Sequence, residues 1–489
     1  MKNPWPRFTL ASLWACTLLG LASALDLFLW YWPDGLFQYD TAGIYCALAW
    51  DTAQGQFYRP LLSPEGYGGT RYMPLFFVVH AGLIRVFGDP VWTGWIWLQA
   101  SVGLAVTALV ALLRQQGLPW KAAVPLGGWL LATAIYQETS LELRCDYLAA
   151  GLVAWALWWL RRGAWRVTAG LLALAFFTKL TCLYALLVAA AWLYSTGRPR
   201  LAAGLMVAVS ALCLLGLALA ESLSGGNFSQ AFLATADGGG LRLSAPRAML
   251  SYLSRDPFMC AAAALLLLQL AVPGLRPHPD RLVRYYLVGA WGITLVIFSS
   301  PGIGLNHHVE THLATLFALG SNSRPPSRKT LGLLGWTLAA LWWAQLVGFL
   351  PSRRAITERE GHSTRATLRD IERRYLPAGI RYLAVNPLVP VLRDERAFVL
   401  DVFNLNHFVA RHHPVGLDFE RRIAAREFQV ILLTRKWVPL ERDYPPGDPE
   451  LNRHQDALWN TQRQLAFVRK HYRMVEVRRP WIVLLPAPD

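Results

Sequence analysis

The sequence predicts a helical protein that crosses a membrane many times and ends in a small soluble α/β domain. Hydrophobic residues make up 54% of the 489 residues, and charged residues make up only 16%. Soluble domains carry about 25% charged residues. The apolar residues are gathered into runs close to the roughly 20 residues that a membrane-spanning helix needs. After residue 350 these runs stop, and Arg, Asp and Glu become frequent.

The first apolar run follows a short basic segment. Met1–Arg7 carries Lys2 and Arg7, and the apolar residues continue from Phe8 to Trp32. This pattern is similar to a signal peptide, but the run is long, contains Asp26 and lacks a small-residue cleavage site. We therefore predict an uncleaved first membrane helix.

Ten further apolar stretches predict about 11 crossings in residues 1–350, which form the predicted transmembrane domain. They lie at 91–113, 121–137, 146–160, 166–178, 180–196, 200–220, 257–274, 283–300, 306–320 and 329–350. The segment Pro74–Gly88 is shorter and carries Arg85, so we predict an interfacial helix there.

Two kinds of loop alternate between these stretches and predict the orientation of the chain. The short basic loops, with Arg114, Arg161 and Arg198 among them, are expected in the cytoplasm, together with the N-terminus. The other loops hold the acids, histidines and glycines and then face the opposite side. They cover 32–73, 137–146, 221–256 and 300–310. Interfacial helices are expected within 32–73.

Residues 351–489 contain no apolar run long enough to cross a membrane. Short β-like runs alternate with amphipathic helical patterns around 363–375 and 453–470. The β-like runs are Phe398–Leu400, Val430–Leu433, Met474–Val477 and Trp481–Leu485. These residues predict a soluble α/β domain on the non-cytoplasmic side, periplasmic or extracellular.

Several classes of function are disfavoured by composition and motifs. The net charge of +16 suggests nucleic acid, but no basic stripe lies on a plausible soluble recognition helix, so we expect no nucleic-acid partner. The chain has no phosphate-binding GxxxxGK[ST] loop, no HExxH and no GxSxG. No CxxC occurs among the six cysteines, which disfavours a thiolate metal site. Cys46 and Cys145 are both expected near the outer face, but spacing alone does not establish a disulfide.

The first outer loop holds the most informative residues. Its stretch Pro33–Tyr45 contains Asp40, which begins a predicted amphipathic helix, and further on come Gln54–Pro60 and Gly68–Leu75. Acids beside the end of a membrane helix are costly to desolvate and commonly mark function. A simple N-cap is the alternative role for Asp40.

This loop resembles that of the GT-C superfamily, membrane glycosyltransferases that use lipid-phosphate sugar donors and include protein mannosyltransferases and the lipid A aminoarabinose transferase of bacteria. The resemblance rests on Asp40 after the first membrane helix, Tyr45 a turn later, the Gly55–Pro60 stretch and Tyr72–Leu75 at the start of an apolar helix. It implies that Asp40 is the catalytic carboxylate. Many relatives have a second acid nearby, whereas this chain has Thr41-Ala42-Gly43.

Further stretches continue the resemblance in the same order along most of the chain. Asp146 begins a predicted span after Leu143-Arg144-Cys145, with a buried Arg144–Asp146 pair as the structural alternative. Lys179 lies in a predicted outer turn, where it would meet a donor phosphate or extend to lipid headgroups. Asn306, His307 and Glu310 lie at the entry to a late span. In the soluble part, Asn386–Leu392 and Arg396–Phe403 look like the tail domain of bacterial relatives.

The resemblance implies an inverting enzyme that moves a sugar from a polyprenyl-phosphate donor to a hydroxyl of a lipid, glycan or protein acceptor at the outer face of the bacterial inner membrane. Asp40 would be the base. Donor phosphate would meet Arg59, Arg71 and Lys179. Asp146 and Glu310 would orient the acceptor or bind a divalent cation, and no other cofactor is implied. Sugar or lipid would contact Tyr45, Tyr72, Asn306 and His307.

Bland alternatives accompany these roles. Interfacial tyrosines such as Tyr45 and Tyr72 are also ordinary membrane anchors. His308 and His312, with His307 and Glu310, have spacings that a metal would tolerate, but further ligands at a fixed spacing are missing. A transporter, a polymerase or ligase of lipid-linked glycans, and a binding or assembly role for 351–489 remain as alternative functions.

Overall fold

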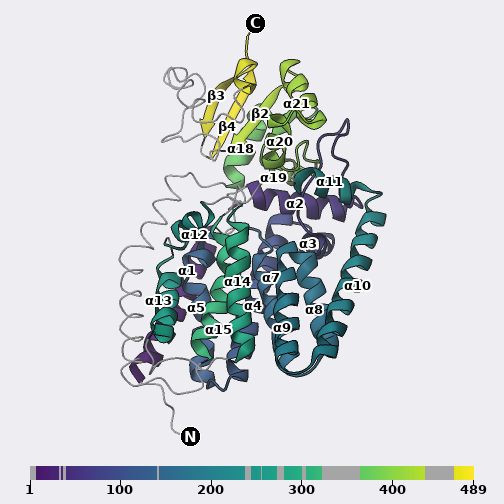
Figure 1. The fold of residues 1–489 in the computed structure, drawn as a ribbon. Helices are drawn as coiled ribbons and strands as arrows, with labels where there is room; N and C mark the ends of the chain where they lie inside the picture. The colour runs from purple at the N-terminus through teal and green to yellow at the C-terminus, as the bar shows by residue number, and fades with distance from the viewer. Residues whose placement is uncertain are drawn as a thin grey trace.

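The computed structural model describes residues 7–31, 35–36, 40–139, 142–236, 244–254, 256–271, 280–299, 304–321, 364–434, 467–478 and 480–488. These residues form a bundle of helices with a small α/β domain at one end (Figure 1). The longer helices of the bundle are α1 (Arg7–Tyr31), α3 (Pro74–Phe87), α4 (Pro90–Gln115), α5 (Trp120–Ala132), α7 (Asp146–Arg161), α8 (Trp165–Thr178), α9 (Leu183–Ser195), α10 (Pro199–Leu223), α13 (Pro257–Ala271), α14 (Arg281–Ile297) and α15 (Val309–Gly320).

Shorter helices gather mainly at the end of the bundle that faces the α/β domain (Figure 1). They are α2 (Asp40–Ala53), α6 (Ala134–Thr139), α11 (Asn227–Ala236), α12 (Ala245–Leu253) and the 3-10 turns η1 (Leu180–Cys182) and η3 (Leu305–His308). The starts of α7 and α15 and the end of α8 lie at this same end. Residues far apart in the sequence therefore meet there.

Helix α4 shows how local sequence sets a helix boundary. The Asp89 carboxylate accepts hydrogen bonds from the backbone N–H groups of Val91 and Trp92, at 2.8 and 3.0 Å. Pro90 occupies the first helical position, where a missing N–H costs nothing. An aspartate followed by proline is thus a strong start signal for the apolar run behind it.

Ten of the predicted spans fall on helices, and the eleventh, 329–350, lies outside the described residues. The predicted span 121–137 is divided, because Thr133 adopts an extended backbone between α5 and α6. Within the described ranges, α4 and α10 are the helices long and apolar enough to cross a membrane. The count of 11 crossings therefore remains a prediction.

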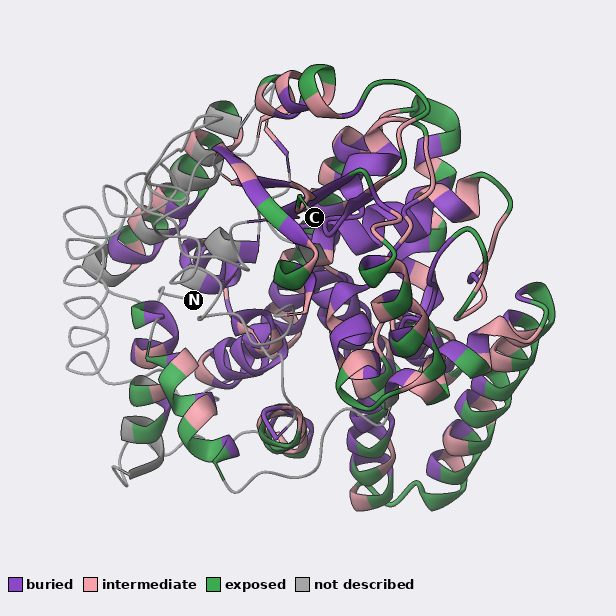
Figure 2. Cartoon of the chain, turned by 90° about the horizontal axis from the view of Figure 1, so that it is seen from above, coloured by how far each residue is buried: buried purple, intermediate pink, exposed green. Residues whose placement is uncertain are grey.

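Helix α10 exposes much of its apolar surface. Its Val207, Leu214 and Leu215 are 67–69% exposed. Figure 2 shows the buried residues where helices pack together and the exposed ones on their outward faces. A helix in the core of a soluble protein would bury such side chains, because burial of apolar surface is what stabilises it there.

The C-terminal domain is built around a four-stranded sheet in the order β1-β2-β4-β3. Its strands are β1 (Tyr382–Ala384), β2 (Val430–Thr434), β3 (Tyr472–Arg478) and β4 (Trp481–Pro486), and its helices are α18 (Arg365–Tyr375), α19 (Leu388–Leu392), α20 (Val402–Ala410) and α21 (Pro414–Ala424), with the 3-10 turn η7 (Val468–Lys470). β1 runs parallel to β2, and β4 pairs antiparallel with both β2 and β3.

The predicted strands 430–433, 474–477 and 481–485 and the helix near 363–375 are confirmed. The predicted strand Phe398–Leu400 is wrong, because Val399 forms only an isolated bridge with Tyr67, and the fourth strand is β1. Most of the predicted helix 453–470 lies outside the described residues, and its last residues form η7.

The outer loop is integrated into the C-terminal domain. Tyr67 is 1% exposed and packs in the same hydrophobic cluster as Ile431 and Leu484 of the sheet. Its hydroxyl donates to the Asp418 carboxylate at 2.7 Å, and its backbone N–H donates to Phe398 O at 2.7 Å. The loop before α3 and the last part of the chain therefore share one core.

Candidate active site

Asp146 and Lys179 form a buried ion pair at the end of the bundle that faces the C-terminal domain. Asp146 is the first residue of α7, and Lys179 follows the last residue of α8 in an extended conformation. The Lys179 Nζ lies 2.7 Å from Asp146 Oδ1, and the two side chains are 14% and 6% exposed. Asn306 of η3 donates from Nδ2 to the other carboxylate oxygen at 3.0 Å. Three separate predicted motifs thus meet at one carboxylate.

Glu310 lies near this pair, on the first turn of α15. It is 5% exposed, and its Oε1 accepts a hydrogen bond from the Cys182 thiol at 3.2 Å. Burial lowers the pKa of Lys179, but the Asp146 and Glu310 carboxylates act in the opposite direction and leave this pKa raised. The Lys179 ammonium is therefore held in its charged form by acids from two helices.

Asp40 is the first residue of α2, and its side chain lies outside the described residues. Within the next turns of α2, the Tyr45 hydroxyl donates to Cys145 Sγ at 3.1 Å. Cys145 directly precedes Asp146, so the first half of α2 lies against the start of α7. The expected base and the Asp146 ion pair accordingly lie on neighbouring elements.

The pKa of His307 is shifted by burial and by the charges around the site. Burial, together with the Lys179 ammonium, lowers the pKa of His307 to about 3, with Arg144 and Arg71 acting in the same direction and Asp146 in the opposite one. The imidazole is therefore neutral at physiological pH. Several cations thus act on the space around His307, which suits a region that meets an anion.

The Arg144–Asp146 pair expected as the structural alternative is not formed. Arg144 instead forms an ion pair with Glu142, two residues earlier. Asp146 takes Lys179 as its ion-pair partner. Because Glu142 neutralises Arg144 next to the site, Asp146 interacts with a cation that the sequence places 33 residues away.

Arg59, expected to bind phosphate, is buried between two parts of the chain. Its Nε lies 2.9 Å from Asp51 Oδ2 of α2, and its Nη1 donates to Ala397 O at 2.5 Å. Burial raises the pKa of Asp51, although the Arg59 and Arg396 cations oppose this rise. These contacts give Arg59 a connecting role between the outer loop and the C-terminal domain, and we omit it from the proposed phosphate site.

The tyrosines of the outer loop are packed together. The rings of Tyr45 and Tyr72 lie 4.6 Å apart, and the Tyr45 ring meets Phe76 edge-on at 5.2 Å. Tyr58 is 3% exposed and donates to Tyr72 O at 2.7 Å. Tyr72 is partly exposed, so of these three tyrosines it is the one with surface left for a ligand.

The residues present do not make a metal centre in the described part of the chain, where no group of three or more His, Cys, Asp and Glu side chains is placed to hold an ion. The Lys179 ammonium already lies against Asp146, and a dication there would be repelled. Cys46 and Cys145 are buried free thiols and do not form a disulfide.

Sequence reasoning missed several residues at this end of the bundle. Cys182 lies three positions after Lys179 in the sequence. This short spacing is a local signal from which Cys182 could have been predicted. The residues of α20 and its C-cap that line a pocket with Arg71 carry no comparable signal, because Asn404 and Arg411 lie more than 300 positions further along the chain. Only tertiary structure places them beside the outer loop.

Solved structures share this fold over nearly the whole chain. ArnT from Cupriavidus metallidurans bound to undecaprenyl phosphate is 14% identical with a TM-score of 0.60, and the match covers 96% of this chain and 99% of that chain. The oligosaccharyltransferase from Archaeoglobus fulgidus in complex with Zn and sulfate is 14% identical with a TM-score of 0.55, covering 94% of this chain and 71% of that chain. The archaeal oligosaccharyltransferase AglB from the same organism, in complex with an inhibitory peptide and a dolichol-phosphate, is 10% identical with a TM-score of 0.51, covering 95% and 72%.

No family model matches the chain, and no curated protein matches it in sequence. The likeness to ArnT and the oligosaccharyltransferase is therefore one of fold. It confirms the fold that the GT-C resemblance implies, with a helical bundle followed by a small α/β domain.

Proposed function

We propose that this protein is an inverting glycosyltransferase that moves a sugar from a polyprenyl-phosphate donor to an acceptor hydroxyl. The observation that carries the proposal is the meeting of Asp146, Lys179 and Asn306 beside Glu310, at the end of the bundle where α2 begins. The fold is shared with proteins crystallised with undecaprenyl phosphate and with dolichol-phosphate, which supports a lipid-linked donor.

We place the bundle in a membrane. The exposed apolar face of α10 supports this location, because water would leave Val207, Leu214 and Leu215 unfavourably hydrated whereas lipid would not. The positive-inside rule assigns the short basic loops to the cytoplasm and the acidic loops to the opposite side, which supports a site at the outer face of the bacterial inner membrane.

Asp40 is the base in this mechanism. Its carboxylate takes the proton of the acceptor hydroxyl as the hydroxyl oxygen attacks the anomeric carbon, and the bond from that carbon to the phosphate oxygen breaks. In-line attack inverts the anomeric centre, and no sugar is attached to the enzyme at any step. Asp146, held in place by Lys179 and Asn306, orients the acceptor together with Glu310.

Cations receive the departing phosphate. Lys179 is kept charged by its acidic neighbours, and Arg71 is exposed at the rim, where its guanidinium can bind phosphate through two hydrogen bonds. Stabilisation of the leaving phosphate by such preorganised cations is usually a large part of the rate enhancement. No step of this mechanism requires a metal ion.

The function is tested by Asp40→Asn in the full-length protein reconstituted into lipid vesicles. Transfer from radiolabelled polyprenyl-phosphate hexoses and pentoses to a membrane extract is expected to fall about 10²–10⁴-fold, the usual contribution of a general base. Asp394→Asn is the matched control, because Asp394 lies in the C-terminal domain at φ 55°, which Asn tolerates. Full transfer by folded Asp40→Asn protein would reject Asp40 as the base.

A secondary transporter is the leading alternative of another class. Transporters bind their substrates near the middle of the membrane between inverted repeats. Here the Asp146, Lys179 and Glu310 network lies at one end of the bundle, which favours transfer chemistry at a surface. Uptake of sugar into vesicles without any release of polyprenyl phosphate would support the transporter instead.

A polymerase or ligase of lipid-linked glycans would use the same end of the bundle. It differs in its donor, which carries a preassembled glycan in place of a single sugar. Supplying both kinds of donor to the same vesicles separates the two, because transfer from the single-sugar donor supports our proposal and transfer of only preassembled glycan supports the ligase.

A further inference from the structure

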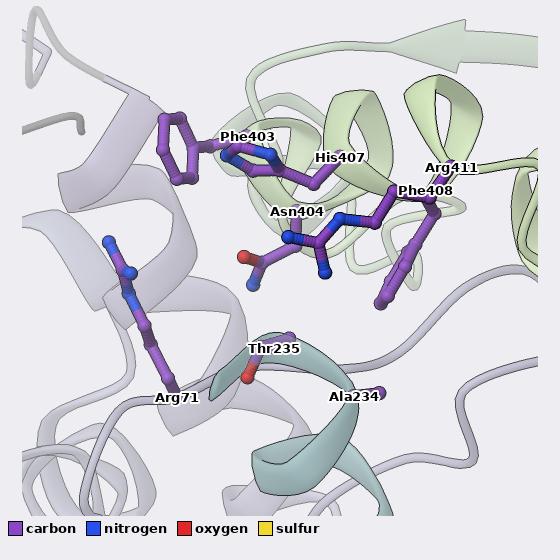
Figure 3. Close-up of a pocket in the computed structure, with 8 residues that line it drawn as sticks. All are labelled: Arg71, Ala234, Thr235, Phe403, Asn404, His407, Phe408 and Arg411. Carbon is purple, nitrogen blue, oxygen red and sulfur yellow. The ribbon is translucent and has the colours of Figure 1, made fainter. Parts of the chain in front are cut away.

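A pocket lies where the outer loop, α11 and α20 meet (Figure 3). Its empty volume is about 240 Å³, which includes solvent at its mouth. The loop before α3, the end of α11 and one face of α20 each contribute to the wall. The lining residues are Arg71, Ala234, Thr235, Phe403, Asn404, His407, Phe408 and Arg411.

The lining of this pocket carries two arginine cations. Arg71 and Arg411 contribute guanidinium groups, and no Asp or Glu belongs to the described lining. In Figure 3 the Arg411 guanidinium and the Asn404 side chain extend toward the same space. The Asn404 amide nitrogen already donates to Asp401 Oδ2 at 2.8 Å, and the Thr235 hydroxyl already donates to Ala231 O at 2.9 Å. The two guanidinium groups are therefore the part of the lining that matches the oxygens of an anion such as phosphate.

The electrostatics of His407 agree with a positively charged pocket. Burial lowers the pKa of His407, and the charges of Arg411 and Arg71 lower it further. Both guanidiniums therefore act on the same imidazole from different parts of the chain. Arg71 also lies over the Phe403 ring at 5.4 Å, which holds its long side chain at the pocket wall.

Arg71 connects this pocket to the Asp146–Lys179 site. Its charge lowers the pKa of His307 as well as that of His407. The pocket is therefore close enough to the candidate active site for one cation to act on both. Arg411, the residue directly after α20 in the C-terminal domain, supplies the other cation.

We propose that this pocket binds a phosphate group of a substrate and that the C-terminal domain completes it through Arg411, which caps the C-terminal end of α20. The proposal rests on the proposed function for the identity of that substrate, since the phosphate belongs either to the donor lipid or to a phosphorylated acceptor. Binding of phosphate itself needs no turnover and is measured separately.

The test is equilibrium binding of radiolabelled inorganic phosphate to the full-length protein in detergent micelles. Wild-type protein is expected to bind phosphate saturably, and Arg411→Gln to bind it about tenfold or more weakly, the loss typical of one charge-assisted hydrogen bond. Arg71→Gln is the second variant, because Arg71 is exposed and its replacement leaves the core unchanged.

Arg473→Gln is the matched control, since Arg473 is exposed on β3 of the same domain and does not line the pocket. It is expected to bind phosphate like the wild type. The proposal is overturned if the wild type shows no saturable binding, or if Arg411→Gln and Arg71→Gln bind phosphate as tightly as the control.

Two competitors identify the source of the phosphate. Undecaprenyl phosphate that displaces the radiolabel from wild-type protein assigns the pocket to the donor lipid. Phenyl phosphate that displaces it while undecaprenyl phosphate does not assigns the pocket to an acceptor. Asp40→Asn protein separates this proposal from the proposed function, because it should keep phosphate binding whatever happens to transfer.

Discussion

Lys179 is a largely buried cation whose charge is compensated by two carboxylates of the candidate site. Its ammonium is 14% exposed and contacts Asp146, with Glu310 nearby. Removing one member of a buried ion pair is costly, because the remaining charge is left without compensation. A simple loss of activity in a Lys179 variant would therefore not separate chemistry from stability.

Paired variants make that separation. Lys179→Gln is expected to destabilise the protein by about 3–5 kcal/mol and to lower transfer at least 10²-fold. Lys179→Gln combined with Asp146→Asn removes both charges, so much of the lost stability should return while transfer stays low. Thermal unfolding and transfer are measured on the same preparations. Recovery of transfer in the double variant would show that Lys179 acts only through stability.

His307 gives the site a pH dependence of stability. Its pKa of about 3 lies below the roughly 6.5 of an unfolded chain, so its neutral form stabilises the fold above that value. This contribution is lost as the pH falls from about 6.5 toward 3. His307→Phe should therefore lose less stability than the wild type between pH 7 and pH 4.5, by up to about 1.4 kcal/mol per pH unit for one proton. Equal losses in thermal unfolding would contradict the assignment.

The GT-C resemblance implied one site for Asp146, Lys179, Asn306 and Glu310. The structure brings these side chains close together, and their use as one site remains a prediction. Their hydrogen-bond partners were not predictable. Glu142 and Asp146 are both two residues from Arg144 in the sequence, and in the structure Arg144 forms its ion pair with Glu142. Which acid an arginine contacts depends on side-chain geometry, which the sequence does not give. Arg59 was assigned to phosphate because nothing in its own neighbourhood indicated Ala397 as an acceptor.

Among the elements, α2 begins at Asp40 and packs against the C-terminal domain. Helix α19 packs against α2, and the contact passes over Gly43. A Cβ at Gly43 would lie 2.1 Å from Asn386 Oδ1 and 3.1 Å from Leu388 N. Asn386 Oδ1 accepts a hydrogen bond from Leu388 N at 3.0 Å, so it is not free to move away.

Gly43→Ala is consequently expected to displace α2 or α19, to destabilise the protein by about 1–3 kcal/mol and to lower transfer. Gly82→Ala in α3 is the matched control, since a Cβ there meets no atom within 4 Å. Adding Asn386→Ala to Gly43→Ala should return part of the activity by making room. Unchanged thermal unfolding and unchanged transfer in Gly43→Ala would contradict the requirement for a glycine where α2 and α19 meet.

Elements with strong local signals were the ones that the sequence predicted well. Apolar runs predicted the bundle helices, and in the structure Asp89-Pro90 marks the start of α4. The strand at Phe398–Leu400 was predicted in error because a strand needs partners: Val399 contacts the loop at Tyr67, whereas Tyr382–Ala384 lies beside β2. Pairing over such sequence distances has no local signature.

At the scale of the whole molecule, the outer loop and the C-terminal domain are held together by charge as well as by apolar packing. Arg59, Asp51 and the backbone of Ala397 lie in one buried contact, and Arg396 approaches Asp51 at 3.8 Å. The site thus depends on a domain that is outside the bundle. The same dependence appears in the pocket shared by Arg71 and Arg411.

Arg59→Met should loosen this connection. Asp51 would remain buried with only Arg396 near it, and we expect a destabilisation of about 3–5 kcal/mol together with faster tryptic release of the C-terminal domain. Arg59→Met combined with Asp51→Asn should slow that release again, because no uncompensated carboxylate is left. Identical digestion of wild type and Arg59→Met would contradict the connecting role.

The buried contact between Arg59 and Ala397 also dictates an order of events during synthesis. The two residues are separated by 338 positions. At about 5–20 residues per second, a ribosome needs roughly 20–70 s to make the chain between them. During this interval the loop that carries Tyr67 lacks the surface on which Tyr67 packs. Newly made chains should therefore stay sensitive to protease at this loop until the C-terminal domain has been made.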